Sequence, residues 1–212
     1  SGVCPGTSAT IGSGLSAGNF VSLPITPNFS FPPSNAVTLT NAGVGTPEPV
    51  GSFGVSYDDG GWPNIPIGFN FNFFGTNYST LNAGTNGNVM FGTFNPASLA
   101  DFTFTTLPSA TEPFNMVALL AMDNNLAGAT GGSVKYWTEG YAPNRKFIVS
   151  YNNVQEYGDT KTSTFQGVFY ETTGIIEVHV QSSTNVDKNK VTGVNNDNGT
   201  IDFLKNNINQ EY

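Results

Sequence analysis

The chain has 212 residues, a formal net charge of −8 with only 7 Lys and Arg residues, and 10% charged residues. That charged fraction is well below the roughly 25% of an average soluble protein, whereas Gly (25), Pro (13) and Phe (17) are abundant. This composition excludes coiled coils and helical bundles, and the scarcity of basic residues argues against nucleic-acid binding. The longest apolar run, Met116 to Met122, is far shorter than the about 20 residues of a membrane helix, so membrane insertion is not expected.

The first 50 residues show few regular patterns. Ser1 to Asn19 is rich in Gly, Ser and Thr, and the prolines in Asn28–Pro33 and Thr46–Pro49 favour extended, loop-like backbone. We therefore divide the chain into an extended N-terminal segment, residues 1–50, that adds strands or wraps the sheets, and a β-sandwich domain, residues 51–212. Ser1 to Leu23 is expected to be disordered alone and to become ordered against a partner domain or subunit.

From about Gly51 onward, apolar residues alternate with polar ones. In Ile65–Phe73 every odd position is apolar, which predicts a strand with one buried face, and Pro66 places its start at a sheet edge or outside the ladder. Met116–Met122 is short enough for a strand buried on both faces. Gly174 can adopt the positive φ that a short loop requires, so the strands before and after it are expected to form a hairpin. The other expected strands are Asn88–Gly92, Ser133–Thr138, Lys146–Tyr151, Thr164–Tyr170 and Ile175–Val180. The fold class predicted is all-β, a two-sheet antiparallel β-sandwich resembling a jelly roll.

Five motifs in fixed order carry a family resemblance. They are Ile65–Gly75, Thr85–Gly92, Val134–Trp137, Ala142–Val149 and Phe165–Glu177. Over Asp58 to Val194 the chain resembles a β-sandwich module of large secreted and surface proteins of Bacteroidota, of the adhesin or gliding-motility type, and is distantly similar to the nidogen-type extracellular domain. The resemblance implies that the protein is extracellular, at the bacterial cell surface. It also implies that the chain is a fragment or a processed part of a longer protein. The chain departs from the family at Ala121–Asn125, where an aromatic-Asp-Asp segment is usual.

Calcium is the one metal for which the sequence offers ligands, because hard cations bind carboxylate, amide and carbonyl oxygens in loops. Asp58, Asp59 and Asp123 are the preferred candidates, since both segments flank long strands. Further oxygen-rich segments are Asp187 with Asn189, and Asn195–Asn198. None completes an EF-hand pattern, and the alternative is that these side chains bond their own backbone in turns.

Catalytic chemistry is not indicated. His179 is the only histidine and is expected at the surface beside Glu177. A serine triad would need a carboxylate that orients this histidine and a serine within its reach, and one titratable group alone does not make a site. Cys4 lies in a Gly/Pro-rich terminus that would not activate a thiol. A glycosidase with paired carboxylates stays open as an alternative, although most of the candidate side chains lie in turns or at solvent-facing strand positions. These candidates are Glu139, Glu156, Asp159, Glu171 and Glu177.

Carbohydrate binding is the main functional alternative. Trp62 lies in a Gly-Gly-Trp-Pro loop, and Trp137 and Tyr141 flank another loop, where exposed aromatic faces could stack on sugars. The competing interpretation is that both tryptophans fill the edges of the sandwich core.

The sequence thus predicts a non-catalytic extracellular structural or adhesive module of a bacterial surface protein or filament. Its expected partners are neighbouring domains or subunits of the same surface protein. The alternatives are a lectin-like carbohydrate-binding module with glycans as partners, and an accessory domain of a secreted hydrolase.

Overall fold

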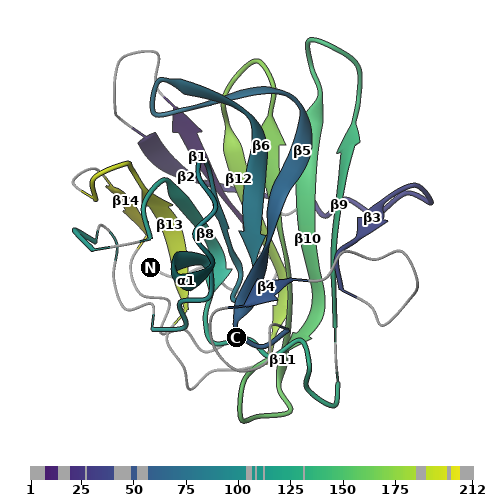
Figure 1. Cartoon of the computed structure of the whole chain (residues 1–212). Helices are drawn as coiled ribbons and strands as arrows, with labels where there is room; N and C mark the ends of the chain where they lie inside the picture. Colours follow the sequence, from purple (N-terminus) through teal and green to yellow (C-terminus); the bar gives the residue numbers. More distant parts are fainter. Residues whose placement is uncertain are drawn as a thin grey trace.

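The computed structural model shows two antiparallel sheets that face each other (Figure 1). Among the residues that the structure describes, each sheet has seven strands. The only helix among the described residues is a single turn, α1 (Pro96–Leu99), which begins at the N-cap Asn95. The predicted all-β sandwich is therefore confirmed. The structure describes residues 8–13, 20–26, 28–40, 49–51, 57–103, 107, 109–111, 113–130, 132–184, 190–199 and 202–205.

Sheet A combines the hairpins of the second half of the chain with strands from the N-terminal segment. Its order is β2 (Phe20–Ile25), β1 (Ser8–Ser13), β12 (Ile176–Ser183), β11 (Thr162–Tyr170), β10 (Lys146–Gln155), β9 (Ser133–Glu139) and β3 (Val37–Thr38). Sheet B carries the middle and the C-terminal part of the chain. Its order is β14 (Asp202–Lys205), β13 (Val191–Asn195), β8 (Met116–Ala121), β7 (Asn88–Met90), β6 (Thr76–Gly84), β5 (Gly60–Phe73) and β4 (Val50–Gly51).

The alternation in β5 is realised as predicted. The apolar side chains at its odd positions are buried between the sheets, whereas the even positions from 64 to 72 face outward. Phe71 stacks on Phe91 with ring centroids 5.5 Å apart and meets the ring of Phe169 edge-on. Pro66 lies at a sheet edge, because β4 pairs only with Gly60 and Gly61. The buried row consists of Ile65, Ile67, Phe69, Phe71 and Phe73.

Strand β8 is buried along its whole length, which confirms the second strand expectation. Its inner face joins the main core, and its outer face packs with Leu99 of α1 and with Leu107. The hairpin between β11 and β12 also forms, with Gly174 at φ 63°. Strand β6 was not expected from the sequence. It follows β5 through a tight turn in which both Phe74 and Gly75 have positive φ, and only the glycine is typical of such a position.

The N-terminal segment contributes to both edges of sheet A. Strands β1 and β2 form a hairpin, and β1 pairs with β12, while β3 pairs with β9 at the opposite edge. The described part of Ser1 to Leu23 is therefore paired within its own chain. The expectation that this segment orders only against a partner is wrong for β1 and for Phe20–Leu23, because an open edge of the same sheet supplies the partner strand. Residues 1–7 and 14–19 lie outside the described residues.

Between β2 and β3, residues 28–36 cross the outer face of sheet A; we call this segment the strap. The Ser30 amide donates to Gln166 Oε1 over 3.0 Å, and Gln166 Nε2 donates back to the Ser30 carbonyl over 2.6 Å. The Asn28 amide donates to His179 Nδ1 over 3.3 Å, and Ala36 packs against the cluster around Trp137. The strap thus spans the sheet from β12 to β9.

Candidate functional site

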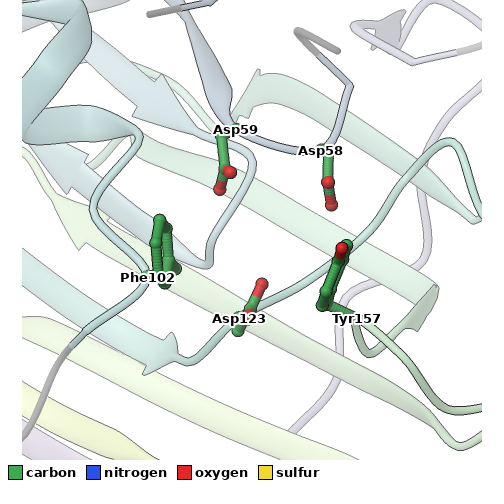
Figure 2. Close-up of a pocket in the computed structure, with 5 residues that line it drawn as sticks. All are labelled: Asp58, Asp59, Phe102, Asp123 and Tyr157. Carbon is green, nitrogen blue, oxygen red and sulfur yellow. The ribbon is translucent and has the colours of Figure 1, made fainter. Parts of the chain in front are cut away.

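One pocket brings together the three acidic residues that the sequence singles out. Asp58, Asp59 and Asp123 line it together with Phe102 and Tyr157, and its volume is about 170 Å³. Figure 2 shows the carboxyl groups pointing into the space between the segments that carry them. The grouping follows from topology, because Asp58 and Asp59 lead into β5 and Asp123 follows β8, both in sheet B.

The turn between β6 and β7 holds the two aspartates that precede β5. Thr85 Oγ1 donates to the Asp58 carbonyl over 2.7 Å and accepts from the Gly60 amide over 3.0 Å. Asn86 Nδ2 donates to Asp59 Oδ1 over 2.9 Å. This turn therefore fixes one wall of the pocket.

The opposite wall is made where β8 and β10 end. The Tyr157 amide donates to the Asp123 carbonyl over 2.9 Å, and the next pair, Asn124 and Glu156, forms an antiparallel bridge. Asn86 Oδ1 accepts from the Asn124 amide over 2.8 Å. Asn86 is fully buried and links both walls, although the residues Thr85–Gly87 carry only a turn signal in the sequence. The single available signal was an amide-bearing residue between two turn-forming ones.

Electrostatics in the pocket disfavour the ionised form of Asp58. Partial burial, followed by the negative charge of Asp59, raises its pKa from 3.8 to about 6. Its Oδ1 atom is buried and has no hydrogen-bond partner. A cation or a hydrogen-bond donor in the pocket would relieve both conditions.

Calcium coordination requires more than proximity. Within the described part of the chain, no three Asp, Glu, His or Cys side chains are placed to hold one metal ion. Asp58, Asp59 and Asp123 share the pocket but do not form a ready ligand shell. The calcium assignment stays a prediction, and the candidates Asp187 and Asn189 lie outside the described residues.

His179 is buried, which corrects the expectation of a surface histidine. Its Nε2 lies 3.0 Å from Glu177 Oε2, as the shared strand face predicted, while its Nδ1 accepts the Asn28 amide of the strap. The strap covers this face of β12, and a local sequence pattern does not reveal a segment about 150 residues away. Both ring nitrogens have structural hydrogen bonds.

The proposed aromatic platform is not formed as the sequence suggested. Trp62 is 1% exposed and Trp137 is 4% exposed, whereas Tyr141 is 91% exposed. Trp62 belongs to the main core. Trp137 does point to the outer face of sheet A, but it packs there with Ile148 and Val168 beneath the strap. The two indoles therefore present no exposed faces for sugar stacking, and only Tyr141 remains at the surface.

Comparisons with known proteins point to a family. The model for NIDO-related domains matches residues 28–211, which include the strap and every described strand except β1 and β2. No curated protein and no solved structure matches the chain. Among the described residues, no helix has the length and apolar character needed to cross a bilayer. NIDO-related domains are typically extracellular and suggest a structural module. The chain belongs to the NIDO-related family.

Proposed function

We propose that the chain is a non-catalytic structural or adhesive module of a bacterial surface protein or filament. Its partners would be neighbouring domains or subunits of that protein. Family membership supports the extracellular structural part of this proposal. The bacterial origin and the adhesive role rest on the low charge and on the motifs between Asp58 and Val194.

The observation that carries the proposal is the strap. It spans the neighbouring strands of sheet A from β12 to β9 through hydrogen bonds to two buried side chains, Gln166 and His179, and through the contact of Ala36 with the Trp137 cluster. The strap stabilises the fold by covering the outer face of sheet A, and the covered part of this face is then not available to bind a ligand. Such an arrangement suits a rigid spacer better than a ligand-binding face.

Each alternative keeps one supporting feature. Exposed Tyr141 is the remaining aromatic candidate for sugar stacking. For a hydrolase accessory domain, the feature is the pocket in which Asp58 titrates near pH 6 beside Asp59 and Asp123. Carboxyls with displaced pKa values are typical of acid–base sites, although ion clusters without catalytic roles show them as well.

Two measurements on the full chain separate these functions. We expect antibodies against the folded chain to label intact source cells, and external protease to remove the label. We also expect a panel of polysaccharides to give neither retention nor new reducing ends. Retention that Tyr141→Ala abolishes would favour the carbohydrate-binding alternative. Turnover that Asp58→Asn abolishes would favour the hydrolase.

A further inference from the structure

Two buried charged side chains flank a buried amide at one end of the sandwich. Among the described residues, Lys190 and Glu156 are the only Lys, Arg, Asp or Glu residues that are buried, each 1% exposed. Asn124 is 0% exposed, and neither Oδ1 nor Nδ2 of its side chain has a hydrogen-bond partner. Complete burial of Lys or Glu is rare, and an unpaired buried amide is costly. Three such residues in one region need an explanation.

The strand register brings Asn124 and Glu156 together. They form an antiparallel bridge, so their side chains point to the same face and their Cβ atoms are about 4.5–5.5 Å apart. Because side chains alternate along extended backbone, this face is opposite to that of their neighbours Asp123 and Tyr157, which line the pocket. Asn124 and Glu156 therefore point to the interior, in agreement with their burial.

The register of β13 against β8 brings Lys190 to the same place. Val191 pairs with Ala121, so continuing the ladder by one residue sets Lys190 opposite Met122. Met122 belongs to the main core between the sheets, whereas Ala121 and Val191 pack on the outer face. Asn124 is two residues beyond Met122 on the same side. This diagonal spacing of about 7–8 Å is within reach of a long side chain.

We propose that Lys190 and Asn124 form an intramolecular isopeptide bond, with Glu156 as the acid–base group. Lys190 Nζ passes a proton to the Glu156 carboxylate and, as a neutral amine, attacks Asn124 Cγ. A tetrahedral intermediate forms, the bond from Cγ to the amide nitrogen Nδ2 breaks, and proton transfer through Glu156 lets ammonia leave. Overall, the protonated amine of Lys190 and the primary amide of Asn124 give one secondary amide and one free ammonium ion. No oxidant, reductant or external co-reactant is needed.

The isopeptide bond would lower the cost of burying these groups and would connect two strands covalently. It replaces a buried ammonium and an unsatisfied primary amide by one neutral amide, which removes a desolvation cost. It also joins the end of β8 covalently to the start of β13, so residues 124–190, which include β9 to β12, form a closed loop. This inference does not depend on the proposed function, although a cross-link of this kind suits a module under tension.

The intact mass of the full chain tests the proposal directly. We expect a mass lower than that of the sequence by one ammonia molecule, about 17 Da, because the amine displaces the amide nitrogen. Asn124→Ala, Lys190→Met and Glu156→Gln should each restore the sequence mass for that variant. The matched control Asn125→Ala, which alters the neighbouring amide, should keep the deficit. A wild-type mass equal to the sequence mass overturns the proposal even if a variant fails to fold.

Peptide mapping excludes the other source of the same mass loss, a succinimide at an Asn-Gly pair such as Asn86–Gly87. The first basic residue of the chain is Lys135, so trypsin releases residues 1–135 as one fragment after unfolding. We expect this fragment to be joined to residues 189–205, with no cleavage after Lys190. Separate fragments 1–135 and 191–205 would overturn the proposal, whatever the intact mass.

Discussion

Substitution of Gln166 tests the role of the strap most closely, because this side chain makes three hydrogen bonds from a fully buried position. It exchanges two bonds with the backbone of Ser30 and donates a third to Ser150 Oγ over 3.2 Å. A net contribution of about 1 kcal/mol for each bond gives about 3 kcal/mol for Gln166→Ala. Because the released strap would regain water, we expect a loss between about 2 and 4 kcal/mol.

Urea unfolding measures this loss, and hydrogen exchange locates it. The Ser30 and Asn28 amides, which donate to Gln166 and His179, should exchange faster in Gln166→Ala, while amides in β8 should keep their relative protection. Gln181→Ala is the matched control, since Gln181 lies exposed on β12, and it should change stability by no more than about 0.5 kcal/mol. A loss below about 1 kcal/mol for Gln166→Ala, with unchanged exchange at Ser30, would refute the anchoring role assigned to this side chain.

Three further predictions concern the core and the pocket. Phe69→Ala should cost about 3–5 kcal/mol in urea unfolding, because the ring is buried and lies beneath the Arg145 guanidinium; a cost below about 1 kcal/mol would contradict its place in the core. The raised pKa of Asp58 means that its ionisation disfavours the folded state, so stability is lost as pH rises from about 4 to about 6. Asp58→Asn should remove that part of the pH dependence and stabilise the chain at neutral pH. If the melting temperatures of the wild type and the variant change with pH in the same way over this range, the explanation is wrong. A calcium ion shared by Asp58, Asp59 and Asp123 predicts that a chelator lowers the melting temperature and that excess calcium restores it, because a ligand that binds only the native state stabilises that state. An unchanged melting temperature, with no calcium bound in calorimetry, would remove the site.

The sequence predicts those parts of the fold that depend on local alternation. Strand β5 has one buried face and therefore a period of two, and β8 has two buried faces and is therefore a continuous apolar run. The sequence also predicts that Asp58 and Asp59 lie near Asp123, because all three residues flank long strands, and the structure places them in one pocket. Local pattern and tertiary environment agree at these positions.

The remaining features depend on contacts between distant segments. The burial of His179 and Gln166 comes from a strap that lies 151 and 136 residues away in the sequence. Trp137 lies on the outer face of sheet A, and only the folded chain shows what covers it. In the same way, Lys190 and Glu156 look like ordinary surface charges in the sequence, and the register of strands from both sheets brings them into the interior.

Stretching single molecules of the full chain between their ends tests the central claim, that the chain is a structural module. We expect one discrete unfolding event that returns on relaxation, as an element that transmits tension requires. The cross-link would also hide the 65 residues between 124 and 190, a length of 66 Cα–Cα steps, so Lys190→Met should extend further than the wild type by about 220–240 Å, at about 3.3–3.6 Å per step. Gradual extension of the wild type with no discrete event would contradict the structural role, whatever the difference in length between the two proteins.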